Sequence, residues 1–197
     1  MLTERERTEI DRLWSRKLEQ DAHGVPLPDR HRNLEPASAE FICSLAAGIG
    51  AKRMLEIGGS SGISTIALAA AARQTGGRLT SIEIEPLRQA EAKRNISKLH
   101  LSEAVEFVLG DAASVLPNYE AIEFAFIDCE KEDYIRFFDM LRLAENAVVI
   151  ADNIISHDLR DYVAMIRSKP GVQSITLPIG KGLEVTRVSS PGERWRP

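Results

Sequence analysis

The stretch that decides the fold is Met54-Leu-Glu-Ile-Gly-Gly-Ser-Ser-Gly-Ile-Ser-Thr-Ile-Ala-Leu-Ala69. Its first apolar residues have the character of a β-strand, and a second apolar run with helical character begins near Gly62. Gly58 and Gly62 allow the backbone to turn sharply and to come close to a ligand, because neither carries a Cβ. The first turn of the helix offers unpaired N–H groups to an anionic group. The stretch therefore predicts a strand, a glycine loop and a helix that hold a nucleotide-type cofactor.

The spacing of the small residues argues against NAD. A dinucleotide fingerprint needs G-x-G-x-x-G/A, but counting from Gly58 puts Ser60 and Ile63 at the second and third positions. One helix later comes Leu79-Thr-Ser-Ile-Glu-Ile-Glu85, a β-branched strand that ends in acid. A carboxylate at that place accepts hydrogen bonds from the two hydroxyls of a ribose. The two features together suit an adenosine cofactor.

Length, composition and charge favour one globular unit. The chain has 197 residues, 44% of them hydrophobic, which is enough for a buried core. A net charge of −4 and a pI near 5.7 argue against a surface that follows nucleic acid, since that needs clustered Lys and Arg. No apolar run reaches the roughly 18 residues of a membrane span, and the N-terminus is too charged for a signal peptide. We expect a soluble, cytoplasmic protein with no membrane or nucleic-acid partner, and Cys43 and Cys129 as small core residues.

The N-terminal residues predict a helical arm and a linker. Ile10, Leu13, Trp14 and Leu18 have helical spacing, and the breaker-rich segment 21–29 follows them. A helix of this length is marginal alone, so we expect it to pack on its own domain or on the second subunit of a homodimer. Residues 1–33 are assigned to this arm and linker, and residues 34–197 to one α/β domain.

From residue 36 onward, helical and strand patterns alternate. An amphipathic helix over 36–49 precedes the first strand. Strands are predicted over 53–58, 78–84, 104–109, 122–127, 146–151, 172–178 and 183–188. Nearly all-apolar strands separated by helices indicate a doubly wound, Rossmann-like α/β fold, with a mostly parallel seven-stranded sheet and helices on both faces. Only Ile179-Gly-Lys-Gly182 separates the last two strands, so we expect an antiparallel hairpin at the sheet edge.

Polar residues follow the carboxyl ends of the strands, where ligands bind in such sheets. If strands four and five are neighbours, Asp128, Asp152 and Asn153 lie side by side. Three oxygen ligands without His or Cys favour Mg²⁺, Ca²⁺ or Mn²⁺, and they leave about three octahedral positions for water or substrate. The alternative is that the two aspartates only end strands and that Asn153 caps the next helix.

Lys131 is the candidate for moving a proton. It follows Asp128 by three residues and is within reach of the same pocket, where a divalent cation disfavours an ammonium and favours a neutral amine. The alternative is a solvated lysine in the charged run Glu130-Lys-Glu-Asp133. We expect His157 in the first turn of the next helix.

Six motifs follow one another along the chain: Leu55-Glu-Ile-Gly-Gly-Ser-Ser-Gly-Ile-Ser64, Ser81-Ile-Glu-Ile-Glu-Pro86, Gly110-Asp-Ala112, Asp128-x-x-Lys131 with Tyr134, Ala151-Asp-Asn153 and Leu177-Pro-Ile-Gly-Lys-Gly-Leu183. In this order they resemble class I S-adenosylmethionine-dependent O-methyltransferases, above all the catechol and caffeoyl-coenzyme A O-methyltransferase group. Six ordered motifs are far more specific than one glycine loop. The resemblance implies that residues 34–197 form a methyltransferase domain.

The resemblance also implies a role for each matching residue. The implied cofactor is S-adenosylmethionine, and its binding residues are Glu56, Gly58, Gly62 and Ser64 in the loop region, Glu83 at the ribose, Asp111 and Ala112 beside the adenine, and Asp128. The implied ligands of a divalent cation, Mg²⁺, are Asp128, Asp152 and Asn153. Lys131 and Asp128 are the implied catalytic residues, with Lys131 as the general base. The acceptor is then a small, catechol-like molecule that is methylated on a hydroxyl.

Two departures leave the acceptor unidentified. The segment 21–35, which would cover the cofactor, does not match the family's pattern, and Lys181 stands in the hairpin where many relatives carry an acid. Phe137 and Phe138 are expected to pack on the sheet rather than to line an acceptor site. Two other functions stay open: a metal-independent methyltransferase that acts on nitrogen, protein or RNA, and a non-catalytic module that binds an adenosine ligand.

Overall fold

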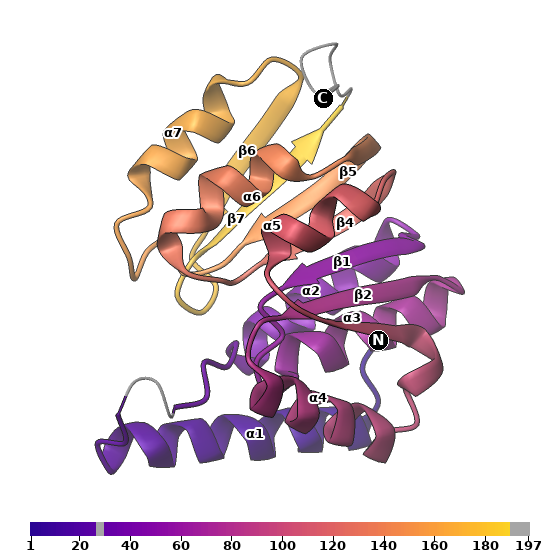
Figure 1. Ribbon diagram of the computed structural model, residues 1–197, viewed down its shortest axis with the longest axis vertical. Coiled ribbons are helices and arrows are strands. Elements are labelled where there is room, and N and C mark those ends of the chain that lie inside the picture. Colours follow the sequence, from indigo (N-terminus) through magenta and orange to yellow (C-terminus); the bar gives the residue numbers. More distant parts are fainter. Residues whose placement is uncertain (27–29, 190–197) are drawn as a thin grey trace.

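The computed structural model describes residues 1–26 and 30–189. Within them, seven strands form one sheet and helices cover both of its faces (Figure 1). The strands are β1 (Arg53–Ile57), β2 (Arg78–Glu83), β3 (Val105–Leu109), β4 (Ile122–Ile127), β5 (Leu143–Ala151), β6 (Val172–Leu177) and β7 (Leu183–Val188). The helices are α1 (Glu4–Ala22), α2 (Pro36–Gly48), α3 (Ile63–Thr75), α4 (Pro86–Lys98), α5 (Ala112–Val115), α6 (Tyr134–Met140) and α7 (Arg160–Ser168). Short 3₁₀ turns are η2 (Ser102–Ala104), η3 (Leu116–Asn118) and η4 (Lys131–Asp133).

The sheet has the strand order β3-β2-β1-β4-β5-β7-β6. Strands β1 to β5 are parallel, and β7 pairs antiparallel with both β5 and β6. This confirms the predicted doubly wound α/β sheet with an edge hairpin. The strand order reverses between β1 and β4, so the loops that follow these strands diverge and leave a crevice at their carboxyl ends.

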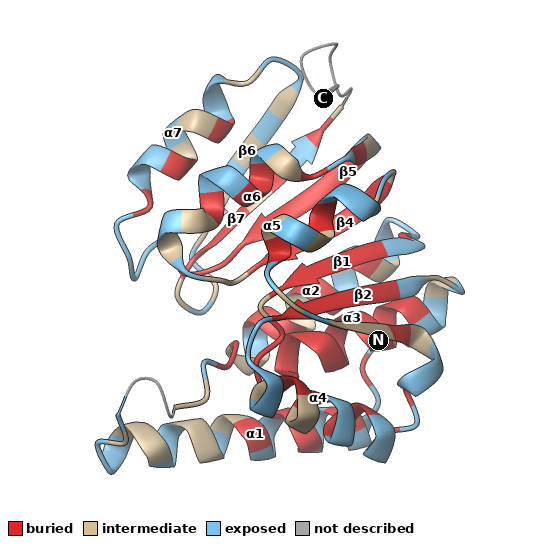
Figure 2. Ribbon diagram, viewed as in Figure 1, coloured by how far each residue is buried: buried red, intermediate tan, exposed pale blue. Residues whose placement is uncertain are grey.

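Alternate residues of the strands enter two separate cores (Figure 2). On β4, Phe124 and Phe126 face the core that α1, α2, α3 and α4 cover, whereas Ala125 and Ile127 face the core beneath α5, α6 and α7. This alternation with a period of two explains why the central strands are apolar along their whole length.

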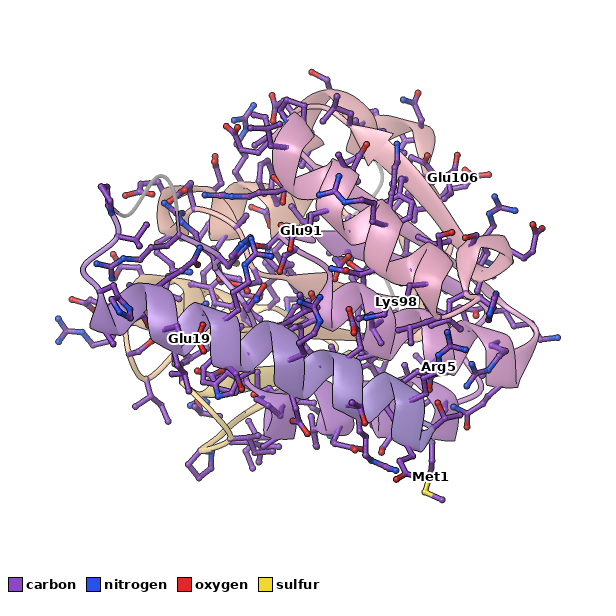
Figure 3. All side chains as sticks on the ribbon, turned by 90° about the horizontal axis from the view of Figure 1, so that it is seen from below. Met1, Arg5, Glu19, Glu91, Lys98 and Glu106 are labelled. Carbon is purple, nitrogen blue, oxygen red and sulfur yellow. The ribbon has the colours of Figure 1, made fainter. Side chains whose placement is uncertain are left out.

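Helix α1 packs against its own chain. Its N-terminus has a capping box, in which the Glu6 amide donates to the Thr3 hydroxyl (3.3 Å) and the Thr3 amide donates to the Glu6 carboxylate (2.7 Å). Ile10 and Leu13 enter the core. Figure 3 shows Glu91 and Lys98 of α4 beside this helix, where Glu91 pairs with Arg16 and Lys98 with Glu9. The sequence predicts that this helix packs either on its own domain or on a second subunit, and in the structure it packs on its own domain.

Most predicted boundaries are within one residue of those observed. The exception is β5, which begins at Leu143 rather than 146, because Leu143 pairs with Ile122 ahead of an irregularity in the β4–β5 register. Asn146 adopts a φ of 61° within that strand. Residues 27–29 and 190–197 lie outside the described part of the chain, and the division into 1–33 and 34–197 stays a prediction. In the described part, no helix is long and apolar enough to cross a membrane.

Candidate active site

A cavity of about 600 Å³ lies at the carboxyl ends of the central strands. Most of the predicted site residues line it: Gly58, Glu83, Asp111, Ala112, Asp128, Lys131, Asp152 and Asn153. They come from five loops that follow five different strands, as the crevice of a doubly wound sheet requires. Glu56, Gly62 and Ser64 do not line the cavity.

Both predicted glycines of the loop occupy positions that only glycine suits. Gly58 has a φ of 94°, and a Cβ there would lie 2.1 Å from the carbonyl oxygen of Asp128. Gly62 has a φ of 106° and caps the N-terminus of α3, where a Cβ would lie 3.3 Å from the Cβ of Ala92. The loop after β1 therefore packs tightly against both the Asp128 loop and α4.

Glu56 lies behind the glycine loop rather than in the cavity. Its side chain is fully buried, and Oε2 accepts hydrogen bonds from the hydroxyls of Ser81 (2.5 Å) and Thr65 (2.7 Å). Burial raises the pKa of this carboxyl, and Oε1 has no hydrogen-bond partner among the described residues. Glu56 thus holds the strand, the loop and the start of α3 together from below. Ser64, in the first turn of α3, is buried and does not line the cavity.

Glu83 is held at the cavity by two backbone amides. Oε2 accepts from the amide of Ser60 (2.8 Å), and Oε1 accepts from the amide of Glu85 (2.9 Å). A carboxylate offers about four lone-pair positions, so each oxygen retains one for a ligand. Because the side chain is only 6% exposed and lines the cavity, these positions suit a pair of neighbouring hydroxyls. Further along the rim, the Asp111 carboxylate caps α5 by accepting from the amide of Ala113 (3.0 Å).

The structure brings together the three predicted metal ligands. Strands β4 and β5 are neighbours, and the amide of Asp152 donates to the carbonyl of Ile127 (3.1 Å). The Asn153 Nδ2 donates to Asp128 Oδ1 (2.7 Å), while Oδ1 of the buried Asp152 has no hydrogen-bond partner among the described residues. Burial, followed by the charge of Asp128, raises the pKa of Asp152 to about 8. Burial likewise raises the pKa of Asp128.

The unpartnered, buried Oδ1 of Asp152, beside the carboxylate of Asp128, is a position that a cation would satisfy. The donor set also fits a hard divalent ion, because the Asn153 amide can present its oxygen after a half-turn about its last side-chain bond. In residues 1–26 and 30–189, no group of three or more His, Cys, Asp or Glu side chains could hold a metal ion. An asparagine ligand is thus needed to complete the set.

Lys131 reaches the same place from η4. Its Nζ lies 3.9 Å from Asp128 Oδ1 and donates to the Tyr134 hydroxyl (3.1 Å) and to the carbonyl of Cys129 (3.2 Å). The Tyr134 hydroxyl in turn donates to the backbone carbonyl of Asp152 (3.2 Å), and burial raises the pKa of Tyr134 well above its usual value. These bonds orient the amine next to the carboxylate pair, so Lys131 is not a solvated surface lysine.

Three predictions at the rim need correction. His157 does not lie in the next helix, because α7 begins at Arg160; it lies in the preceding turn and lines the cavity. Cys43 is buried as predicted, but Cys129 is half-buried and lines the cavity, because it follows the strand end directly. Phe138 packs in the core as predicted, whereas the buried Phe137 also borders the cavity.

The linker before α2 forms a wall of the cavity; segment 21–35 is expected from the sequence to cover the cofactor, but the contacts that hold it there are not predicted. Asn33 is buried, accepts from the Ser61 hydroxyl (2.6 Å) and donates to the carbonyl of Leu13 (3.2 Å). Arg32 pairs with Glu130 from the far side of the cavity. The segment lacks helical or strand periodicity, so its polar residues gave no signal that they would bridge the glycine loop and the Asp128 loop.

The strand order, the glycine loop after β1 and the acidic strand ends define a doubly wound α/β protein with a cleft for a nucleotide-type cofactor. The O-methyltransferase family model matches residues 18–188. The chain therefore belongs to the O-methyltransferase family.

Individual relatives agree with this assignment. The chain is 37% identical over 120 residues to a catechol O-methyltransferase of Mycobacterium tuberculosis, a match that covers 59% of this chain and 54% of that protein. The structure of cofactor-bound Rv0187 from MTB superposes with a TM-score of 0.77 at 26% identity over 90% of each chain. The O-methyltransferase from Bacillus cereus in complex with SAH gives a TM-score of 0.77 at 24% identity, covering 92% of this chain and 90% of that one, and supports the fold alone. The chain spans about half the length of the curated relatives it matches.

Proposed function

We propose that the protein transfers the methyl group of S-adenosylmethionine to a hydroxyl of a small, catechol-like acceptor held on a divalent cation, with Lys131 as the general base. The observation that carries this proposal is the carboxylate pair of the half-buried Asp128 and the buried Asp152, with one Asp152 oxygen unpartnered, in the same cavity as Lys131 and Glu83. The name of the mycobacterial relative, a catechol O-methyltransferase, supports the class of acceptor.

The glycine loop and Glu83 form the cofactor half of the cavity. Glu83 faces the cavity with its carboxylate fixed by two amides, and we assign it to the two ribose hydroxyls. Gly58 lets the backbone come close to the methionine part, and the segment Asp111-Ala112 borders the adenine in this assignment. Glu56 acts from behind the loop, through its hydrogen bonds with Ser81 and Thr65.

Asp128, Asp152 and Asn153 would hold the cation in the acceptor half. When bound, S-adenosylmethionine supplies a methyl group already activated on a sulfonium, and the cation supplies a Lewis acid that acidifies a hydroxyl. The protein must then align the oxygen with the methyl carbon and remove one proton. Lys131 Nζ, oriented by Tyr134 and the Cys129 carbonyl, accepts that proton.

The test is a calorimetric titration of S-adenosylmethionine into the purified protein, repeated with Mg²⁺ plus catechol and again with EDTA. We expect the cofactor to bind in each case, and catechol to bind and be methylated only when the metal is present. Catechol methylation that survives EDTA would instead favour a metal-independent enzyme, in which the Asn153 amide keeps its bond to Asp128. Absence of cofactor binding would overturn the proposal.

The structure does not support the feature on which the non-catalytic interpretation depends, which is a helix cap formed by Asn153. In that interpretation Asn153 caps the helix after β5, but the N-cap of α7 is Leu159 and the cap has no side-chain hydrogen bond. Asn153 instead adopts a φ of 65° and its side chain binds Asp128. A strained backbone at a buried polar residue of a cavity is typical of a functional site.

A further inference from the structure

The loop between β6 and β7 offers one side chain to the cavity, that of Lys181. On either side of it, Gly180 has a φ of 57° and Gly182 a φ of 93°. A Cβ on Gly180 would lie 2.6 Å from the Ser38 Oγ, and one on Gly182 would lie 2.5 Å from the Ile155 Cγ1. Neither flanking position accepts a side chain, so residue 181 determines the chemistry that this loop contributes.

The backbone of the loop is fixed to the turn that follows Asn153. The carbonyl of Lys181 accepts from the amides of Ile155 (2.9 Å) and Ser156 (3.2 Å), and the carbonyl of Gly182 accepts from the amide of Ile154 (3.0 Å). The Cα of Lys181 is therefore held beside the predicted metal ligands, and its side chain lines the cavity. A group attached to an acceptor at the metal is within reach of this side chain.

The ion pair that the structure records for Lys181 is long. Its Nζ lies 3.7 Å from Glu35 Oε1, and 36% of its side chain is exposed. Two other lining cations have shorter ion pairs, both with Asp21. The Nζ of Lys17, in α1, lies 2.5 Å from its carboxylate, and the Nη1 of Arg30, in the linker, lies 3.2 Å from it. Arg32 pairs tightly with Glu130 across the cavity. An anion that approaches Lys181 has only a long ion pair to displace.

Carboxylates surround Lys181. Glu35 forms its ion pair and does not line the cavity, and the charge of Lys181 also acts on Asp21, Asp128 and Asp152. A divalent cation at Asp128 and Asp152 would compensate those two carboxylates, and Lys181 would then keep only the long ion pair to Glu35 and the contribution of Asp21.

We propose that Lys181 is a specificity-determining residue that binds an anionic substituent of the acceptor, so that the preferred acceptors are aromatic vicinal diols bearing a carboxylate. The inference rests on the proposed function, because the diol must be held at Asp128, Asp152 and Asn153. A charge-assisted hydrogen bond between ammonium and carboxylate is stronger and shorter than a neutral one. A site built around such a bond discriminates against analogues that lack the charged group.

The experiment compares three acceptors of the same ring: 3,4-dihydroxybenzoate, the neutral 3,4-dihydroxybenzyl alcohol and the cationic 3,4-dihydroxybenzylamine. Their kcat/KM values are measured with the wild-type protein, with Lys181→Met and with Lys93→Met, which removes an exposed lysine of α4 outside the cavity. Calorimetry of the same compounds with the Mg²⁺-loaded, cofactor-bound protein gives a second readout that does not depend on turnover.

We expect the wild type to prefer the benzoate to the alcohol by about tenfold or more, in keeping with one charge-assisted hydrogen bond. Lys181→Met should reduce that ratio to near one in both kcat/KM and affinity, and Lys93→Met should leave it unchanged. A wild type that does not discriminate, or a Lys181→Met variant that keeps the ratio, would overturn the inference while leaving the methyltransferase function intact. Failure to methylate or bind any of the three diols would overturn the proposed function, and this inference with it.

Discussion

In the proposed reaction, Lys131 accepts the proton of the acceptor hydroxyl. Its Nζ is 3.9 Å from Asp128 Oδ1, and two further hydrogen bonds fix its direction. We predict that Lys131→Met lowers kcat by about 10²- to 10⁴-fold, the usual contribution of a general base. The affinity for S-adenosylmethionine, measured by calorimetry, should change little, because Lys131 is not among the residues that we assign to the cofactor. Lys93→Met is the matched control, and a variant that retained full kcat would exclude Lys131 as the base.

Residues at strand ends could be predicted because parallel strands deliver their carboxyl ends to one edge. For this reason the sequence predicts that Asp128, Asp152 and Asn153 lie together, as the hydrogen bond between Asn153 and Asp128 shows. The order of the strands does not indicate whether a side chain near the glycine loop points into the cavity or away from it. Glu56 alternates with the apolar residues of β1 and so points away from the cavity, toward Ser81 and Thr65. Similarly, Ser64 follows the glycine loop by two residues, and the sequence does not indicate that it is buried in the first turn of α3 outside the cavity.

The tight packing of the glycine loop can be tested by comparing Gly58 with Gly76, the glycine that caps the C-terminus of α3. Gly58 and Gly76 both adopt a positive φ, but a Cβ on Gly58 would lie 2.1 Å from the Asp128 carbonyl oxygen, whereas nothing lies within 4 Å of one on Gly76. We predict that Gly76→Ala costs about 1 to 2 kcal/mol of unfolding free energy, the strain of a left-handed alanine. Gly58→Ala should cost roughly 3 kcal/mol or more, because the Asp128 loop must also move.

Urea denaturation measures both variants, and calorimetry measures the cofactor affinity of each. Gly76→Ala should bind S-adenosylmethionine like the wild type, whereas Gly58→Ala should lose affinity along with stability. If the two variants lose the same unfolding free energy, then the close contact between Gly58 and the Asp128 carbonyl does not contribute to the cost of a side chain at residue 58.

Strand and helix patterns located the elements, but not the polar contacts that lock the hairpin to α7. Glu184 on β7 is fully buried and accepts hydrogen bonds from Arg167 Nε (3.0 Å) and from the Ser174 hydroxyl (2.6 Å). A buried carboxylate needs such partners. Its position in the alternating apolar and polar pattern of β7 gives no indication of these partners, because they come from two separate elements, α7 and β6. The same reason explains why the contacts of the linker, through Asn33 and Arg32, could not be predicted.

At the scale of the whole molecule, the N-terminal arm and the C-terminal hairpin both contribute walls to one cavity. The linker that follows α1 contacts the glycine loop through Asn33, and its last residue, Glu35, pairs with Lys181 of the hairpin. Ordering of the arm is therefore coupled to both halves of the cavity, through contacts between residues far apart in the chain. Association into a homodimer stays a prediction.

The carboxylate pair should make the stability of the whole molecule depend on pH and on metal. The pKa of Asp152 is raised from 3.8 to about 8 in the fold, first by burial and then by the charge of Asp128. Between these values the folded protein binds more protons than the unfolded chain, so the free energy of unfolding contributed by this group falls as the pH rises. The slope is at most about 1.4 kcal/mol per pH unit for one proton.

We therefore predict that, in EDTA, the wild type loses stability relative to Asp152→Asn as the pH rises from about 5 to 8, because only the wild type has a carboxyl at this position. Asp158→Asn is the control, since Asp158 is exposed and its bond to Arg160 lowers its pKa to about 2, outside this range. Saturating Mg²⁺ should stabilise the wild type most at the upper end of the range, because the ion binds the deprotonated carboxylates and releases their protons. Urea midpoints at several pH values, with EDTA and with Mg²⁺, measure both effects. If the wild type and Asp152→Asn respond in parallel to pH, and neither responds to Mg²⁺, then the two aspartates are not a cation site.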